Sequence, residues 1–171
     1  EDLIGKNPIT AVKLPRGRKR HRKALTSDEA RSLLESARDE SDPLYAVYVL
    51  ILVLGLRRGE VLGLTWDDVD LDVRELTVRL QIQRVGGQLL HRETKTEASD
   101  APLPLPEVCV TALRHQRVRR DELKQRAGKA WHELGLVFTT RYGTPIEPRN
   151  LARSYETRLR KAGVRRITLH D

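Results

Sequence analysis

The apolar residues of this chain recur with two different periods, which divide it into helical and extended segments. The first helix is predicted to begin after Thr26, because Thr26-Ser27-Asp28-Glu29 is a capping box whose hydroxyl and carboxylate each accept a backbone N–H hydrogen bond. The helix reaches about Arg38 and is expected to bury four residues that share one face: Ala30, Leu33, Leu34 and Ala37.

The next helix is apolar around its whole circumference. Asp42-Pro43 caps its start, an unbroken apolar run extends from Leu44 to Leu54, and Gly55 can end it. A membrane span needs about 20 such residues, so this shorter run predicts a core helix that other elements surround. A short amphipathic segment, Glu60–Leu64, follows.

Between Arg74 and Leu105 the period changes from helical to alternating, which is typical of half-buried strands. Leu76–Gln83 is the first predicted strand, Gly86-Gly87 suits a tight hairpin turn, and Gln88–Glu93 is expected to return antiparallel. After a polar loop, the prolines of Ala101–Leu105 confine this third strand to a sheet edge.

The remaining chain is mostly helical in period. Glu107–Ala127 predicts a long helix with a basic outer face, and Pro148–Ala162 a helix that ends at Gly163. A short strand, Leu136–Thr139, and a turn at Tyr142–Pro145 are expected between them, and Ile167–Asp171 is expected to begin a further element. The pattern therefore predicts an α+β fold that is mainly α-helical, with a small three-stranded antiparallel sheet.

The composition is that of one soluble globular domain, with 171 residues of which 39% are hydrophobic and 33% charged. No secretory signal precedes the first helix. The single cysteine, Cys109, excludes an internal disulfide framework and a cysteine-only zinc site, and it fits a reducing cytosol. The chain contains no methionine, so we expect it to be part of a longer protein.

Positive charge is concentrated outside one acidic stretch. The net charge is +8, yet 12 acidic and 5 basic residues between Asp28 and Glu75 give a local balance of −7, and the rest of the chain carries +15. Such a basic surface either solubilises the protein or attracts polyanions, of which nucleic acid is the commonest in a cytosol. With seven aromatic residues, contact with a duplex backbone is favoured over base stacking on single strands.

Residues 1–24 are expected to form a basic linker that follows another domain. Asn7-Pro8 and Leu14-Pro15 break any helix, and Lys13–Lys23 holds seven basic residues and no acid. Such a run either lies along a DNA backbone or is a solvated tether. In the first case the DNA contacts come from six residues: Arg16, Arg18, Lys19, Arg20, Arg22 and Lys23.

Arg57-Arg58 directly follows the helix that is expected to be buried. An arginine held against a core needs a carboxylate or a bound anion beside it. Arg57 therefore either pairs with Glu60 to close the turn or presents a bidentate, permanently charged group to a phosphate. Spacing alone assigns no role to Lys95, which lies in a loop, or to His170, which lies near the end.

An acidic cluster, Asp67, Asp68, Asp70 and Asp72, raises the question of a metal site. A calcium loop that began at Asp68 would have Val73 where glycine is needed and Arg79 where glutamate is needed, so the calcium interpretation fails. These acids are expected to be caps and turn residues, and a magnesium nuclease remains an alternative.

Three segments, in this order, resemble the catalytic domain of tyrosine recombinases, the phage integrase family. Leu54–Asp70, with the letters LGLRRGEVLGLTWDDVD, is similar to the family's first arginine box. Thr94-Lys95-Thr96 and the following Ala101–Leu105 resemble the family's hairpin lysine and its next strand. The stretch that ends in Leu169-His170-Asp171 resembles the approach to the family's His-x-x-Arg box. The ordered match extends from about Leu25 to the end.

The resemblance implies a reaction and a role for each matching residue. In this family a tyrosine attacks a DNA phosphodiester without metal, which gives a 3′-phosphotyrosine and a free 5′-hydroxyl, so no cofactor is expected. Arg57 would stabilise charge on the phosphate with Glu60 as its supporting carboxylate, Lys95 would protonate the departing 5′-oxygen, and His170 would assist proton transfer. Arg58 and Arg149 are expected to contact DNA.

The family's second arginine and its nucleophile have no match, since all four tyrosines precede His170: Tyr45, Tyr48, Tyr142 and Tyr155. Residues 25–171 are therefore expected to be a partial catalytic domain that lacks its C-terminal helices, exposes an apolar patch and cannot cleave DNA. Mixed with a suicide DNA substrate, it should give no covalent adduct.

The resemblance implies double-stranded DNA as the partner and a parent protein that acts as a homotetramer on DNA. It also implies a cytoplasmic protein of bacterial or phage origin, with neither a membrane nor a small-molecule substrate as partner. Two alternatives stay open at this point: a non-catalytic DNA-binding regulator on the same scaffold, and a metal-dependent nuclease.

Overall fold

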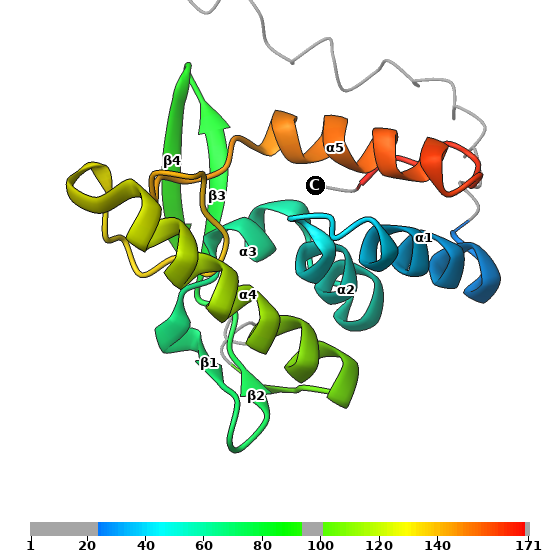
Figure 1. Cartoon of the computed structure of the whole chain (residues 1–171), viewed down its shortest axis with the longest axis horizontal. Coiled ribbons are helices and arrows are strands. Elements are labelled where there is room, and N and C mark those ends of the chain that lie inside the picture. Colours follow the sequence, from blue (N-terminus) through cyan, green and yellow to red (C-terminus); the bar gives the residue numbers. More distant parts are fainter. Residues whose placement is uncertain (1–23, 94–100, 170–171) are drawn as a thin grey trace, which may run out of the picture.

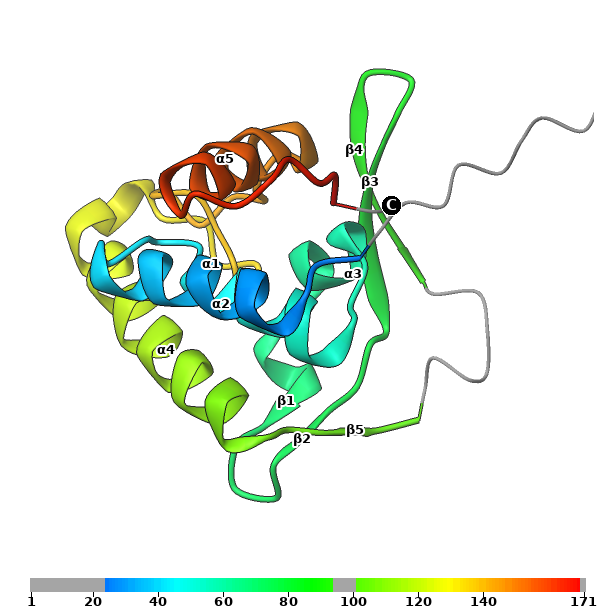
Figure 2. The same ribbon diagram turned by 90° about the vertical axis from the view of Figure 1, so that its right-hand side faces the viewer.

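The computed structural model describes residues 24–93 and 101–169, and about half of this part is helical. Five α-helices and two short 3₁₀ turns are present: α1 (Ser27–Asp39), α2 (Tyr45–Leu54), α3 (Arg58–Gly63), η2 (Trp66–Asp68), α4 (Glu107–Ala127), η4 (Gly128–Ala130) and α5 (Pro148–Lys161). Figures 1 and 2 show α1 and α2 as a layer between α5 and α4, with a β-hairpin at one side. The architecture confirms the predicted α+β class.

The capping box that the sequence predicts at the start of α1 is present. The backbone N–H of Glu29 donates to Thr26 Oγ1 at 3.2 Å, and the N–H of Thr26 donates to Glu29 Oε2 at 2.8 Å. Leu33 and Ala37 are fully buried against the core, whereas Ala30 and Leu34 are half-buried. The sequence pattern thus predicted both the helix and the face it buries.

Helix α2 forms the centre of the core, although it begins later than predicted. Asp42 does not cap it from the preceding position; its Oδ1 instead accepts the N–H of Leu44 at 2.8 Å, and α2 begins at Tyr45. Ala46–Leu50 are buried on all sides, but Val53 near the end is 40% exposed. The prediction of a helix enclosed all round is therefore wrong for its last turn. Gly55 ends α2 in the left-handed region, at φ 70°.

The extended region forms two separate sheets rather than one. Strands β1 (Val69–Asp70), β2 (Glu75–Leu76) and β5 (Leu103–Pro104) form a three-stranded antiparallel sheet in the order β1-β2-β5. Strands β3 (Leu80–Val85) and β4 (Gln88–Glu93) form a hairpin of their own. The predicted strand from Leu76 to Gln83 is divided, because residues 77–79 belong to neither sheet and β3 begins only at Leu80.

The β3–β4 hairpin has the turn that its glycines predict. Gly86 and Gly87 have φ values of 57° and 82°, the conformation of a two-residue turn that only glycine adopts at little cost. The hairpin rises beyond the level of α5 (Figures 1 and 2). It is joined to the body through β3, which packs on α3 and on α5.

The contact between α3 and β3 depends on two glycines. A Cβ added at Gly63 would lie 2.7 Å from the carbonyl oxygen of Leu80, and one added at Gly59 would lie 2.9 Å from that of Ile82. Backbone lies against backbone at both points, so this packing holds the hairpin directly over the start of α3.

The two long C-terminal helices match their predictions closely. Helix α4 has the predicted bounds, and α5 ends one residue early, with Ala162 as its C-cap. The predicted strand Leu136–Thr139 is wrong, because only the isolated bridges of Leu136 with Thr65 and of Thr139 with Pro145 form there. Cys109 is buried on α4. None of the described helices is long and apolar enough to cross a membrane.

A buried arginine ties helix α5 to α1 and to the loop that follows α1. The side chain of Arg158 is only 7% exposed. Its Nη2 lies 2.6 Å from Asp42 Oδ2, its Nη1 lies 3.0 Å from Glu40 Oε1, and Nη1 also donates to the carbonyl of Ser36 at 3.1 Å. The position of α5 relative to the core is therefore fixed near its C-terminal end.

Candidate functional site

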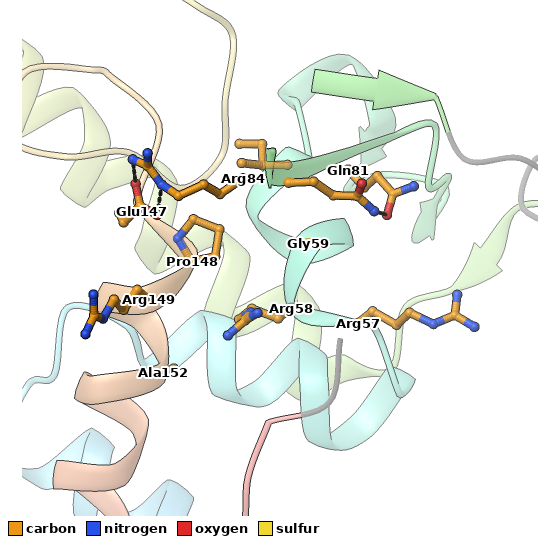
Figure 3. A pocket seen from close by; sticks show the side chains of 11 residues that line it. Arg57, Arg58, Gly59, Gln81, Arg84, Glu147, Pro148, Arg149 and Ala152 are labelled. Carbon is orange, nitrogen blue, oxygen red and sulfur yellow. Dashed lines mark hydrogen bonds and ion pairs between the residues drawn. The ribbon is translucent and has the colours of Figure 1, made fainter. Parts of the chain in front are cut away.

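A cleft of about 390 Å³ lies between the start of α3, strand β3 and the start of α5. Its walls carry four guanidinium groups and two amides together with one carboxylate: Arg57, Arg58, Gln81, Gln83, Arg84, Glu147 and Arg149 (Figure 3). Three elements that are far apart in the sequence thus contribute one concentrated positive charge. We call this the arginine cleft.

Arg57 stands at the N-cap position of α3 and is tied to Glu60 at two points. Its backbone N–H donates to Glu60 Oε2 at 2.7 Å, and its Nη1 lies 2.8 Å from Glu60 Oε1. The Glu60 side chain is 12% exposed. A largely buried carboxylate therefore holds the exposed Arg57 side chain in place.

The sequence expectation for Arg57 is therefore half correct. The predicted pair with Glu60 is present, but the side chain is 68% exposed and is not held against the core. The reason is that α2 ends at Gly55 and the chain turns outward before α3 begins. In Figure 3 the Arg57 side chain points away from Arg58 and Arg149.

Arg84 and Glu147 face each other across the cleft and form a bidentate ion pair. Arg84 Nε donates to Glu147 Oε1 at 2.7 Å, and Nη2 donates to Oε2 at 2.5 Å (Figure 3). Arg84 Nη1 also donates to the carbonyl of Gly87 in the hairpin turn. The hydrogen bond from Arg84 holds the pKa of the Glu147 carboxyl below its ordinary value, so the pair is charged at neutral pH.

Arg58 and Arg149 carry the charge at the α5 side of the cleft. Arg149 is exposed and follows Pro148, the first residue of α5, so the positive end of the helix dipole adds to its charge. Arg58 is half-buried at the start of α3, and Figure 3 shows its guanidinium on the same side as that of Arg149. Guanidinium groups so placed suit the bidentate binding of phosphate oxygens.

The structure thus brings together the described residues that the sequence singled out. Arg57, Arg58 and Arg149 line one cleft, and Glu60 supports it from beneath. Sequence reasoning missed Arg84 and Glu147, because an arginine at a polar strand position and a glutamate before a proline carry no distinguishing pattern.

The other predicted site residues lie outside the described part of the chain: Lys95, His170, Arg16, Arg18, Lys19, Arg20, Arg22 and Lys23. Their neighbours in the chain are described. Strand β4 ends at Glu93, two residues before Lys95. Leu169, directly before His170, lines an apolar groove of about 520 Å³ that Arg57 also borders.

This groove is an apolar concave surface beside the arginine cleft. It runs between the starts of α1 and α3, the last turn of α2 and residues 167–169, and it includes Leu25, Ile51, Leu52 and Leu56. Leu56 is buried and the other three are half-buried, so the exposed apolar patch that the sequence analysis expects stays a prediction.

None of the four tyrosines, all of which the structure describes, lines the arginine cleft. Tyr48 is fully buried and Tyr155 is 3% exposed, and their rings lie 5.8 Å apart. Burial raises the pKa of Tyr48 and raises that of Tyr155 to about 12, so neither forms a nucleophilic phenolate readily. Tyr45 is half-buried, and Tyr142 lies in an exposed turn beside Arg141.

The acidic cluster acts as caps and turn residues, as the sequence analysis expected. Asp68 is buried and accepts hydrogen bonds from the N–H of Thr65 at 3.0 Å and from its hydroxyl at 2.6 Å. Asp70 Oδ1 accepts the N–H groups of Asp72 and Val73, both at 2.9 Å. Within residues 24–93 and 101–169, no group of three or more histidine, cysteine or acidic side chains could hold a metal ion.

Comparison with known proteins shows a family match over most of the chain. Residues 23–171 match the model of the phage integrase family. The chain is 32% identical over 181 residues to a protein named tyrosine recombinase XerC-like from Caldanaerobacter subterraneus subsp. tengcongensis, with 96% of this chain and 46% of that protein aligned. It is also 32% identical over 171 residues to an integrase of Streptomyces ambofaciens. That alignment covers 94% of this chain and 42% of the relative.

Solved structures show the same fold. The XerA recombinase matches with a TM-score of 0.65 and 25% identity over 86% of this chain and 46% of its own. The Tn1549 transposon integrase in complex with transposon right end DNA matches with a TM-score of 0.73 and 22% identity, over 92% of this chain and 51% of its own. A lambda integrase tetramer bound to a Holliday junction matches with a TM-score of 0.54 and 19% identity, over 96% of this chain and 41% of its own. The chain spans about half the length of the relatives it matches.

Proposed function

The chain belongs to the phage integrase family, and from this premise we propose that residues 25–171 are the catalytic-domain segment of a site-specific DNA recombinase. Residues 1–24 would be the basic linker from a preceding DNA-binding domain. The arginine cleft would bind the phosphate backbone of duplex DNA. The observation that carries this proposal is that Arg57, Arg58 and Arg149 line one cleft, with Arg57 fixed by the carboxylate of Glu60.

The proposed reaction exchanges one phosphate ester for another. A tyrosine oxygen forms a bond to the scissile phosphorus, and the bond from phosphorus to the 5′-oxygen breaks. Arg57 stabilises the negative charge on the non-bridging oxygens, a role that a metal ion would otherwise have. Lys95 gives a proton to the departing 5′-oxygen, and His170 assists proton transfer at the nucleophile.

The attacking tyrosine would lie outside these 171 residues. The support is that Tyr48 and Tyr155 are buried, while Tyr45 and Tyr142 do not line the arginine cleft. The segment by itself is therefore proposed to bind DNA without cleaving it. The complete protein would act on double-stranded DNA as a tetramer in the cytoplasm of a bacterial cell, where integration or excision of a mobile element takes place.

The proposal is tested with the full-length protein that contains these residues and a suicide substrate, a duplex nicked so that the cleaved end diffuses away. We expect the full-length protein to form a covalent DNA adduct and residues 1–171 alone to form none. Arg57→Lys should retain DNA affinity within about threefold and slow adduct formation by at least about 100-fold, because lysine lacks the bidentate donors.

Arg126→Ala is the matched control, since this exposed arginine lies at the end of α4, away from the cleft. It should leave both DNA affinity and cleavage unchanged. Unchanged turnover in Arg57→Lys would refute the role of Arg57. Failure of the full-length protein to form any adduct, with DNA binding retained, would favour the non-catalytic regulator instead.

A further inference from the structure

We propose that Glu147 limits how tightly the arginine cleft holds the DNA backbone, because its carboxylate offsets the charge of Arg84 on the opposite wall. Arg84 is then a further phosphate-binding residue, and Glu147 is its counter-charge. The inference rests on the proposed function, since it takes duplex DNA as the occupant of the cleft. It concerns two residues to which neither the sequence motifs nor the family resemblance assigns a role.

Glu147 is the only carboxylate among the described residues that line the cleft, beside four guanidinium groups. Its Oε1 accepts a hydrogen bond from Arg84 Nε at 2.7 Å, and its Oε2 accepts one from Arg84 Nη2 at 2.5 Å (Figure 3). The charge of Arg149, two residues further along the chain, also lowers the pKa of the Glu147 carboxyl. By the same attraction, this carboxylate weakens the positive field that Arg84 and Arg149 present to a phosphate.

The Glu147 side chain does not act as a helix cap. Glu147 is the N-cap residue of α5, yet its side chain accepts no hydrogen bond from the N–H groups of that helix. Its backbone carbonyl starts the helix instead, and accepts the N–H of Asn150 at 2.8 Å and that of Leu151 at 3.2 Å. Glutamine at this position would leave these backbone bonds in place and keep one oxygen as an acceptor for Arg84. The replacement therefore changes the charge of the cleft and little else.

Arg84 has hydrogen-bond donors left for a phosphate. A guanidinium carries five N–H groups, and the hydrogen bonds of Arg84 within the described part of the chain use three of them: two with Glu147 and one with the carbonyl of Gly87. The bond to Gly87 anchors the side chain within its own hairpin, independently of α5. The side chain is 49% exposed, so a phosphate can reach the remaining donors. Without the charge of Glu147, Arg84 is expected to stay on the wall of the cleft and to bind a phosphate more strongly.

A limit on backbone affinity matters to an enzyme that acts at specific sites. Phosphate contacts carry no direct sequence information, so they hold a duplex of any sequence. They supply essentially all of non-specific binding, and tighter contacts prolong each encounter with the wrong DNA. A carboxylate that offsets one of the four guanidinium groups shortens these encounters without removing an arginine from the cleft.

The test measures binding of the full-length protein to a random-sequence duplex, by fluorescence anisotropy over a range of salt concentrations. The other DNA contacts of the protein are the same in every variant, so differences between variants report on the cleft. We expect Glu147→Gln to raise the affinity about three- to tenfold at low salt. It should also steepen the slope of log affinity against log salt concentration by about 0.9, the value for one added phosphate contact.

Arg84→Gln should lower the affinity instead, because it leaves the carboxylate of Glu147 unpaired beside the phosphates. The double variant, Arg84→Gln with Glu147→Gln, has the same net charge as the wild type and should bind DNA within about twofold of it. Glu133→Gln is the matched control, since this glutamate is also paired with an arginine, Arg120, and lies outside the cleft. It changes the net charge of the chain by the same amount as Glu147→Gln and should leave both affinity and slope unchanged.

An unchanged or lower affinity of Glu147→Gln overturns the inference, and a lower one would show that the carboxylate only positions Arg84. A rise that Glu133→Gln reproduces also overturns it, because net charge rather than location would then be the cause. Arg149→Gln distinguishes these failures from failure of the proposed function. If Arg149→Gln weakens binding while Glu147→Gln does not strengthen it, only the present inference is wrong. If Arg149→Gln leaves affinity and slope unchanged, the cleft does not bind DNA and the proposed function fails as well.

Discussion

At the scale of single residues, the position of α5 depends on a buried cation. The side chains of Arg158 and Asp42 are 7% and 11% exposed, and the guanidinium reaches both Asp42 and Glu40. Removal of one partner from such a pair leaves a charge without compensation in a poorly solvated place. The consequence extends beyond the pair, because α5 also carries Arg149 and Glu147 into the arginine cleft.

We therefore predict that Arg158→Met lowers the free energy of unfolding by about 3 kcal/mol, measured by urea denaturation of the 171-residue chain. Addition of Asp42→Asn should recover part of this loss, because the unpaired carboxylate is then removed. Arg153→Met, an exposed arginine on the same helix, should change stability by no more than about 0.5 kcal/mol. Equal effects of the two methionine variants would contradict this account.

The sequence could not single out Arg158 from the other arginines of α5, because its burial depends on an acidic loop 116 residues away. It could single out Arg57, because that residue lies in a motif with Glu60 and follows an apolar run that must be in the core. Motif residues are visible in a sequence; the partners that tertiary contact supplies are not.

At the scale of elements, the contact of α3 with β3 decides where the hairpin stands. Gly63 faces the backbone of Leu80 and Gln81, with three atoms between 2.7 and 2.9 Å from an added Cβ. Gly59 faces one carbonyl oxygen at 2.9 Å, and its other neighbours are at 3.7 Å or more. A side chain at either position would push the strand from the helix, and the displacement would be larger at Gly63.

We predict that Gly63→Ala lowers the free energy of unfolding by about 1–3 kcal/mol and that Gly59→Ala costs less, as measured by the midpoint of denaturant unfolding. Both glycines are in the same short helix, so the change in helix propensity is matched. A larger loss at Gly59 than at Gly63 would show that backbone contact is not the cause.

The elements also show where sequence periodicity succeeds and fails. The bounds of helix α4 agree with the prediction, because Pro106 precedes its first residue and Gly128 follows its last. The strands were predicted as one sheet, yet β2 and β5 have only two residues each and belong to a different sheet from β3 and β4. Alternation predicts that a segment is extended, but strand pairing is decided by contacts distant in sequence, such as that of Leu76 with Leu103.

At the scale of the whole molecule, ion pairs of glutamate side chains make the folding stability depend on pH. The hydrogen bond from Arg84 lowers the pKa of Glu147, that from Lys161 lowers the pKa of Glu40, and that from Lys124 lowers the pKa of Glu133. In the unfolded chain these carboxyls return to ordinary values near 4.5 and bind more protons over that range. Their contribution to stability is therefore complete above about pH 4.5 and is lost as the pH falls through the lowered values.

We expect these groups to cause no change in the midpoint of urea unfolding near neutral pH. Below about pH 4.5 the midpoint should decrease steadily. The variant with Glu40→Gln and Glu147→Gln should be less stable at neutral pH and lose less on acidification, because two of the titrating groups are absent. Parallel curves for this variant and the wild type would argue against the linkage.

The whole molecule also contains a single thiol that is shielded from solvent. Cys109 lies in the core on α4, and burial raises its pKa to about 11, so little of it is the reactive thiolate at neutral pH. Because no other cysteine occurs in the 171 residues, a cysteine introduced at any surface position would be the sole site for a maleimide dye or spin label. Labels for a distance measurement between the hairpin and α5 can therefore be attached at introduced cysteines without first replacing Cys109.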